Sequence, residues 1–309
     1  MTPAPRHLAL VGSTAAGKSA VALEVARQLD DVELVSVDSM QVYRRMDIGT
    51  AKPTPAERAE VPHHLLDLVE PREAFSVARF QAAAREAIAG IERRGHRALL
   101  VGGTGLYLQA VVDGLAVPGE WPVVRAELEA AAATPAGAEG LHRRLVELDP
   151  AAAARMEPGN RRRIVRALEV TVGSGRPFSS YGPGLDAYPP TSFRLAGISL
   201  PREVLDERIT RRLDSQLAAG FVDEVRALAS EDEPLSRTAR QALGYRELLA
   251  HLDGRCPLDD AIAETTRRTR AFARRQRAWF RRDPRVTWLD AEENPFAVLP
   301  ALLGNWIDR

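Results

Sequence analysis

Short apolar runs alternate with amphipathic stretches along the first 113 residues, the pattern of a parallel sheet covered by helices. The runs predict buried strands at residues 7–12, 33–38, 65–69 and 97–102. The stretches with helical periodicity predict helices at residues 18–29, 76–94 and 103–112. The second of these strands ends in a carboxylate, Asp38.

The pattern changes after residue 114. Helical stretches rich in Ala, Arg and Leu are predicted at residues 124–133, 141–148 and 160–172, and a segment rich in Gly and Pro follows them. Residues 193–200 predict another strand, and only helices are expected from there to residue 309. We therefore expect three parts: an α/β core in 1–114, a helical insertion in 115–190 and the second part of the core in 191–309.

Composition excludes several classes of protein. The 309 residues are 45% hydrophobic and 27% charged, and 42 basic residues balance 42 acidic ones. This is an ordinary globular composition, and it excludes a strongly basic protein but not a basic face on a neutral one. Cys256 is the single cysteine, so no internal disulfide can form. No leader segment or apolar membrane span is recognised, and we expect a cytoplasmic monomer that does not bind membranes.

One motif points to chemistry. Residues 12–19 read GSTAAGKS, a full G-x-x-x-x-G-K-[ST] phosphate loop that lies between a predicted strand and a predicted helix. Backbone N–H groups of such a loop point at phosphate oxygens, its lysine adds a positive charge, and its hydroxyl binds Mg²⁺. The phosphate-binding residues are therefore predicted to be Gly12, Ser13, Thr14, Ala15, Ala16, Gly17, Lys18 and Ser19, with Ser19 as the Mg²⁺ ligand. The alternative is a glycine turn that only caps a helix.

The motif does not identify the phosphate compound. A GTPase needs an N-K-x-D sequence, and neither of the two lysines, Lys18 and Lys52, lies in one. A kinase or ATPase remains possible, because Asp38 ends an apolar strand as a magnesium-binding aspartate does in those enzymes.

Four further segments carry a resemblance to a known family. They are DSMQVY at 38–43, MDIGTAKP at 46–53, GGTGLYLQAVVDGL at 102–115 and QALGYRE at 241–247. Together with the phosphate loop, and in this order, they closely resemble the tRNA dimethylallyltransferase family over nearly the whole chain. The resemblance implies a P-loop NTPase-like parallel sheet core with an inserted all-helical domain that binds the tRNA anticodon arm, and a helical C-terminal part. It also implies transfer of a dimethylallyl group from dimethylallyl diphosphate to the exocyclic amine of the adenosine beside the anticodon.

The resemblance assigns roles to three residues of the reaction site. It makes Asp38 the general base, and a carboxylate there suits an acceptor amine that becomes acidic as it bonds to carbon. A magnesium ligand or a carboxylate that caps the next segment are the alternatives for Asp38. Thr104 is implied to belong to the site, or else to cap the helix that follows it. Arg212 matches an arginine that the family uses near the donor diphosphate.

A stripe of basic residues suggests a surface that binds RNA. Arg267, Arg270, Arg274, Arg277 and Arg281 recur at spacings of three and four and share one helical face, although a merely solvated face in an arginine-rich chain is the alternative. The resemblance and the stripe together predict these tRNA-binding residues: Asp38, Ser39, Met40, Gln41, Thr104, Arg162, Arg163, Ile164, Val165, Arg166, Gln241, Gly244, Tyr245, Arg246, Arg274, Arg277 and Arg281.

Three rival functions remain. An adenylate isopentenyltransferase uses the same donor with a free nucleotide, but a small acceptor does not explain the insertion and the stripe. A P-loop small-molecule kinase would consume ATP. A non-catalytic RNA-binding P-loop protein would bind tRNA without transferring a group to it.

Overall fold

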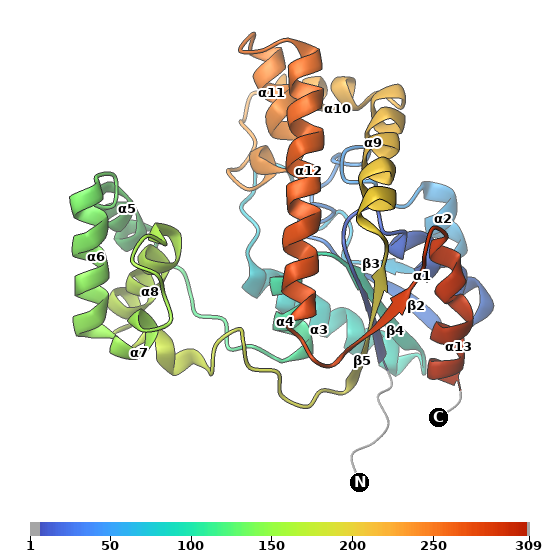
Figure 1. Cartoon of the computed structure of the whole chain (residues 1–309), viewed down its shortest axis with the longest axis horizontal. Coiled ribbons are helices and arrows are strands. Elements are labelled where there is room, and N and C mark those ends of the chain that lie inside the picture. The colour runs from blue at the N-terminus through green and yellow to red at the C-terminus, as the bar shows by residue number, and fades with distance from the viewer. Residues whose placement is uncertain (1–6, 308–309) are drawn as a thin grey trace. The chain divides into compact units, whose positions relative to one another are not determined.

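The computed structural model describes residues 7–307 and divides them into two compact units (Figure 1). The sheet unit comprises residues 7–113 and 188–307, and the helical unit comprises Gly114–Ala187. Each unit has its own hydrophobic core. No helix among residues 7–307 combines the length and the apolar character that crossing a bilayer requires.

One six-stranded sheet forms the centre of the sheet unit. Its strands are β1 (His7–Val11), β2 (Val32–Val37), β3 (His63–His64), β4 (Arg97–Gly102), β5 (Phe193–Ser199) and β6 (Val286–Asp290). They are parallel throughout and lie in the order β3-β2-β4-β1-β5-β6. Every residue of β1 is buried, as expected for a strand covered by helices on both faces. The α/β fold class predicted from the sequence is confirmed.

Two predictions about strands are wrong. Residues 65–69 form no strand, because Leu65 and Asp67 have positive φ angles of 65° and 55°, and the chain pairs with β2 at His63–His64 instead. Helices were expected from residue 201 onward, but β6 forms there and pairs with β5. It is an edge strand of five residues with only Val286 buried, so its apolar pattern is weak.

Helices cover both faces of the sheet. On one face lie α1 (Lys18–Gln28) and α13 (Leu299–Ile307), and Val21, Val25 and Leu302 share a core cluster there. On the other lie α3 (Val77–Arg93) and α4 (Gly105–Val112), with Phe80 and Leu108 in a second cluster. These helices confirm the predicted ones, and α2 (Pro55–Glu60) is added, capped by Thr54 and Glu57.

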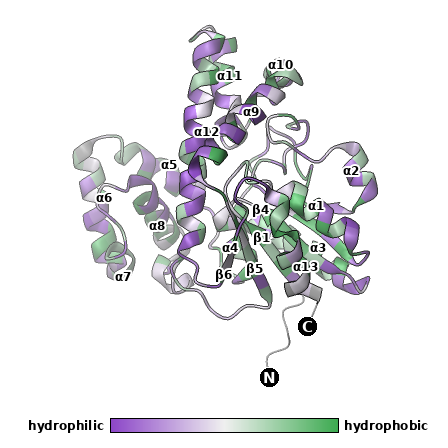
Figure 2. Cartoon of the chain, turned by 45° about the vertical axis from the view of Figure 1, so that its right-hand side comes forward, coloured by the Kyte–Doolittle hydropathy of each residue, from purple (hydrophilic) through white to green (hydrophobic). Residues whose placement is uncertain are grey.

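The remaining helices of this unit stand beyond the carboxyl ends of the strands, at the top of Figure 1. They are α9 (Arg202–Ala218), α10 (Phe221–Ala229), α11 (Tyr245–Leu252) and α12 (Leu258–Arg281), with the short 3-10 turn η2 (Ala239–Gln241). A further 3-10 turn, η3 (Pro295–Val298), leads into α13. The strands are largely hydrophobic, whereas α12 is largely hydrophilic (Figure 2). A long polar helix therefore rises from the edge of the sheet where ligands bind in open α/β folds.

The helical unit contains α5 (Pro122–Ala131), α6 (Pro135–Leu148), α7 (Pro150–Ala153), α8 (Arg161–Ser174) and the 3-10 turn η1 (Phe178–Tyr181). Leu128, Leu145 and Leu168 lie in its core. The predicted helices are confirmed, but α6 begins six residues earlier than residue 141, where the Thr134 hydroxyl accepts a hydrogen bond from the Gly137 N–H.

Candidate active site

The phosphate loop connects β1 to α1 at the carboxyl end of the central strands. Gly12 and Gly17 have φ angles of 148° and 87°, which favour glycine, and Ala15 has a φ of 62°. A Cβ atom at Gly17 would lie 2.5 Å from the Cβ of Pro295, so η3 packs directly on the loop. Gly17 is the N-cap of α1 and makes no side-chain cap, so the first N–H groups of this helix depend on other acceptors.

Lys18 folds back over this loop. Its side chain is buried, and its Nζ donates to the Ser13 carbonyl at 2.7 Å. Burial and the neighbouring Arg212 lower the pKa of Lys18 to about 8, while Asp38 acts in the opposite direction. A buried cation next to another cation is poorly compensated, and an anion in the loop would relieve it.

A pocket of about 410 Å³ lies against the loop and collects residues that are distant in the sequence. Thr14, Ala15, Gly17, Lys18 and Ser19 line it. Asp38 enters from the end of β2 and Arg212 from α9. Other lining residues, which the sequence analysis did not predict for this site, include Thr50, Ala51, Arg208, Arg211, Phe272 and Gln276. The structure thus brings most of the predicted loop together with Asp38 and Arg212.

Two arginines of α9 contact the loop. Arg208 donates from Nε to the Ala15 carbonyl at 2.9 Å, and Arg212 reaches the Thr14 hydroxyl at 3.4 Å. Burial lowers the pKa of Arg212, and the Asp38 carboxylate opposes this shift. Arg208 and Arg212 lie four residues apart and so share one face of α9. That spacing was the available signal for Arg208.

Asp38 and Thr104 occupy the ends of two neighbouring strands, β2 and β4. Asp38 Oδ1 accepts a hydrogen bond from the Met40 N–H at 2.8 Å. Thr104 is the first residue before α4, but its hydroxyl does not cap that helix. The hydroxyl accepts instead from the Ser39 N–H at 3.2 Å, so Thr104 holds the segment that carries Asp38. The expectation that it caps α4 through its side chain is wrong.

Both the oxygen and the nitrogen of the Gln41 side-chain amide make hydrogen bonds. Its Oε1 accepts from the Ser36 hydroxyl at 2.7 Å, and its Nε2 donates to the carbonyls of Thr50 and Ala51 at 3.1 and 3.2 Å. Met40 is half-buried against the main core. In this structure Gln41 therefore fixes a wall of the pocket.

Glu224 of α10 binds the backbone of residues 47–49, which precede the same wall of the pocket. Its carboxylate accepts hydrogen bonds from the N–H groups of Asp47, Ile48 and Gly49 at 2.9, 2.7 and 3.1 Å, and from the Tyr245 hydroxyl at 2.5 Å. Burial and Glu224 raise the pKa of Tyr245. The segments MDIGTAKP and QALGYRE thus meet at one carboxylate.

This arrangement corrects part of the predicted RNA surface. Gly244 and Tyr245, which were predicted to bind tRNA, are buried and are therefore not exposed to RNA in this structure. Lys52 is not available to RNA either. Its side chain is 1% exposed, and its ammonium is bound to the Tyr43 carbonyl and to the carboxylates of Asp47 and Asp67.

The arginine stripe on α12 is only partly available. Arg267 is paired with Glu264, and Arg270 bonds to Thr210 of α9. For Arg274, Arg277 and Arg281 no ion pair is found within residues 7–307. On the neighbouring helices, Gln241 and Arg246 are exposed. They line a hollow of about 440 Å³ together with three more arginines, Arg237, Arg240 and Arg255.

The helical unit contains the remaining predicted RNA contacts. Arg162 and Arg163 are exposed on α8. Ile164 and Val165, which were also predicted to bind tRNA, are 1% and 5% exposed in the core of this unit, so their side chains are not on its surface. Arg166 is bound to the buried Glu169 and to the carbonyls of Pro118 and Gly119, which makes it a structural residue. A helix turns inward those positions that recur every three to four residues, and a matching sequence motif does not distinguish them.

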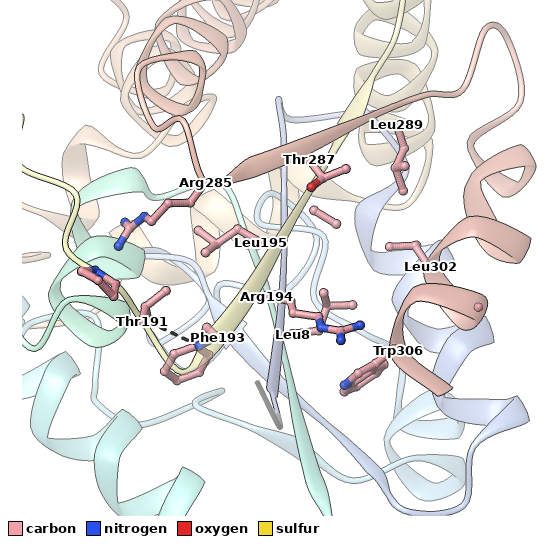
Figure 3. Close-up of a pocket in the computed structure, with 13 residues that line it drawn as sticks. Leu8, Thr191, Phe193, Arg194, Leu195, Arg285, Thr287, Leu289, Leu302 and Trp306 are labelled. Carbon is pink, nitrogen blue, oxygen red and sulfur yellow. Dashed lines mark hydrogen bonds between the residues drawn. The ribbon is translucent and has the colours of Figure 1, made fainter. Parts of the chain in front are cut away.

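A larger hollow lies elsewhere in the sheet unit (Figure 3). It has a volume of about 820 Å³ and is bounded by Phe193 and Arg194 at the start of β5, and by Trp306 of α13. Arg285 also lines it, but its guanidinium is bound to Asp113 and Asp283. No phosphate-loop residue lines this hollow, so the chemistry belongs to the smaller pocket.

The pocket also fits a magnesium ion. Within the described part of the chain no cluster of three or more His, Cys, Asp or Glu side chains forms a complete metal site. Mg²⁺, however, usually takes only one or two protein ligands and completes its shell with phosphate oxygens and water. The exposed Ser19 hydroxyl at the start of α1 lines this pocket and would be one such ligand.

Comparisons with known proteins agree with this architecture. Residues 41–283 match the family model described as IPP transferase, and residues 6–68 match the one described as isopentenyl transferase. A tRNA dimethylallyltransferase from Streptomyces avermitilis is 50% identical over 307 residues, which cover 99% of this chain and 97% of that protein.

Solved structures give the same result. The crystal structure of a tRNA isopentenylpyrophosphate transferase from Bacillus halodurans is 39% identical, with a TM-score of 0.70, and covers 98% of this chain and 96% of its own. A eukaryotic dimethylallyltransferase described as acting on tRNA is 27% identical, with a TM-score of 0.76, and covers 93% of this chain and 74% of its own. The chain therefore belongs to the IPP transferase family, together with these tRNA dimethylallyltransferases.

Proposed function

We propose that this prenyltransferase moves the dimethylallyl group of dimethylallyl diphosphate to the exocyclic N6 amine of the adenosine on the 3′ side of the anticodon in tRNA, releasing diphosphate. Membership of the family supports tRNA as the acceptor. One observation carries the chemistry: a single pocket gathers a phosphate loop, the buried Lys18 and the half-buried Arg212 with one carboxylate, Asp38.

The cations suit the leaving group. In the transfer, the bond between C1 of the allylic group and the diphosphate oxygen breaks while a bond from N6 to C1 forms. Negative charge grows on the diphosphate, and Lys18, Arg208 and Arg212 lie where they would stabilise it. Mg²⁺, when bound at Ser19 and the diphosphate oxygens, would supply further charge for the same purpose.

Asp38 suits the acceptor. The lone pair of the N6 amine is delocalised into the adenine ring, and the nitrogen becomes acidic as it bonds to carbon. The Asp38 carboxylate would accept that proton, and the bond from the Met40 N–H to Oδ1 leaves its second oxygen available for this. The segment held by Thr104 would then fix the orientation of the base.

The RNA contacts are part of the same proposal. Surface arginines on α12 (Arg274, Arg277 and Arg281) and on α8 (Arg162 and Arg163) would contact phosphates of the anticodon arm. Gln241 and Arg246 would do so from the basic hollow. We also expect the reaction to take place in the cytoplasm and the protein to be a monomer.

Labelled dimethylallyl diphosphate tests the proposal directly. The protein is incubated with the donor, Mg²⁺ and unmodified tRNA, and the tRNA is then digested to nucleosides. Label in one adenosine derivative supports the proposal. Label that appears only in added AMP would indicate an adenylate isopentenyltransferase, and ATP consumption without label in either acceptor would indicate a kinase. A Lys18→Ala variant serves as the control for transfer that does not use this pocket.

A further inference from the structure

We infer that Gln276 is a positioning residue of the donor site. It lies on α12, the helix that carries the arginines proposed to face RNA, and its side chain ties the phosphate loop to the turn after β4. Its role in binding diphosphate rests on the function proposed above, whereas its hydrogen bonds to Thr14 and Gly103 are observed independently of that function. The side chain is 7% exposed and lies in the middle of the exposed arginines of α12.

Both ends of the Gln276 amide are used. Its Oε1 accepts a hydrogen bond from the Thr14 N–H at 2.7 Å, although the two residues are 262 positions apart in the sequence. Its Nε2 donates to the Gly103 carbonyl at 2.9 Å. The side-chain amide offers an acceptor and a donor side by side, whereas an ionised Glu has no donor and Met makes neither bond.

The surrounding backbone is built for this close approach. A Cβ atom at Gly103 would lie 2.1 Å from the Gln276 Nε2, and one at Gly105 would lie 2.3 Å from the Trp279 ring. One turn before Gln276, the Ala273 carbonyl accepts a hydrogen bond from the Ser13 hydroxyl at 3.0 Å. Helix α12 therefore holds two consecutive residues of the phosphate loop, Ser13 and Thr14.

This contact sets what the loop presents to a ligand. With Ser13 and Thr14 fixed to α12, the chain at Ala15 turns through its positive φ angle and brings the later N–H groups and Lys18 to the pocket. If the Gln276 bonds are lost, the Thr14 N–H has no fixed acceptor and the loop samples other conformations. Binding diphosphate would then cost additional ordering.

Pyrophosphate binding tests this role without prenyl transfer. Calorimetry with magnesium pyrophosphate, in the absence of tRNA, compares the unsubstituted protein with Gln276→Met and Gln276→Glu. Methionine has a similar volume but makes neither bond, and we expect its dissociation constant for pyrophosphate to rise about tenfold or more. Glutamate keeps the acceptor for Thr14 but turns a second oxygen to the Gly103 carbonyl and adds a negative charge. We therefore expect Gln276→Glu to lose more pyrophosphate affinity than Gln276→Met.

A matched control separates positioning from general stability. Thr265 is a buried polar residue of the same helix, and its hydroxyl donates only to the Ala261 carbonyl within α12. We expect Thr265→Ala to lower the melting temperature and to leave pyrophosphate affinity unchanged. In steady-state assays Gln276→Met should raise the KM for dimethylallyl diphosphate at least tenfold, with kcat at saturation within about threefold and tRNA affinity within about twofold.

The outcomes are distinct. A folded Gln276→Met protein that binds pyrophosphate within twofold of the unsubstituted protein overturns the inference. So does a loss of affinity that Thr265→Ala reproduces. If the unsubstituted protein itself binds no pyrophosphate, the donor site of the proposed function is refuted, and the role of Gln276 with it.

Discussion

Two carboxylates stand at opposite ends of strand β2, and their surroundings give them different tasks. Glu33, at the start of the strand, is 2% exposed and accepts hydrogen bonds from Arg94, His64 and His96 at 2.6–2.8 Å. These bonds, Arg94 above all, lower the pKa of Glu33 to about 2. Asp38, directly after the strand, receives one bond, from the Met40 N–H, and lines the pocket. Glu33 therefore stabilises the fold, whereas Asp38 is placed for chemistry.

Replacement of Asp38 separates proton transfer from RNA binding. Asp38→Asn keeps an oxygen for the Met40 N–H but loses the basic carboxylate. We expect kcat to fall about 100- to 10,000-fold while tRNA affinity stays within about twofold. Single-turnover transfer and filter binding with the same tRNA measure the two quantities. A strong loss of tRNA binding in Asp38→Asn and in Asp38→Ala would mean that this carboxylate organises the RNA site instead.

Glu33 predicts an acid-sensitive fold. Its pKa of about 2 lies below the ordinary value of 4.5, so the stabilisation is present above pH 4.5 and is lost as the pH falls toward 2. Glu33→Gln should cost about 3 kcal/mol at pH 7, and this cost should shrink below pH 4.5. Urea unfolding at pH 7, 5 and 4 measures it, with the exposed Glu86→Gln as control. A penalty that does not change with pH would exclude the ionised Glu33 as its source.

At the scale of elements, α12 combines two functions on two faces. Ala273, Gln276 and Phe280 are buried and face the phosphate loop and the core, while Arg274 and Arg281 are exposed beside them. Hydrogen bonds from its buried face attach the arginine-bearing helix directly to Ser13 and Thr14 of the phosphate loop.

The exposed face predicts a salt dependence. Each phosphate contact that an arginine makes contributes about 0.7–0.9 to the slope of log affinity against log salt concentration. Replacing Arg274, Arg277 and Arg281 by Gln should therefore lower the slope for tRNA by about 2 to 3 and leave pyrophosphate affinity unchanged. Arg267→Gln is the matched control, because this arginine is already paired with Glu264. A loss of slope in the control of about one third of that in the triple variant would show that the stripe acts only through net charge.

At the scale of the whole molecule, the helical unit is attached through two chain segments that the sheet unit itself holds together. Arg285 bonds to both the Asp113 carboxylate and the Pro189 carbonyl, at 2.7 and 2.6 Å, and the Thr191 hydroxyl donates to the Val112 carbonyl. Because each unit has a separate core, the sheet unit does not depend on the helical unit for burial.

Excision of the helical unit follows from this arrangement. With residues 114–187 replaced by a short Gly-Ser linker, we expect a cooperatively folded protein that still binds magnesium pyrophosphate and binds tRNA at least about tenfold more weakly. Thermal unfolding, calorimetry and filter binding check the three properties. Undiminished tRNA affinity would remove the helical unit from the RNA interface, and loss of folding would show that the two cores are not independent.

Wherever the signal is local, sequence and structure agree. The phosphate loop, four of the six strands and the helices of the insertion were predictable, because periodicity and the glycine spacing of a tight loop act between near neighbours. Strand β6 was missed because an edge strand needs few apolar residues. Arg208 was also missed, although its spacing from Arg212 along α9 carried the signal.

Short local patterns were enough to specify the fold family and the positions of the phosphate loop and its carboxylate. Which side chains of each motif are available to a ligand depends instead on how the chain packs in three dimensions. This packing buries Tyr245, Ile164 and Val165, ties Glu224 to the backbone that precedes the wall of the pocket, and brings Gln276 to Thr14. Such contacts join residues that are far apart in the chain, and packing, rather than periodicity, selects them.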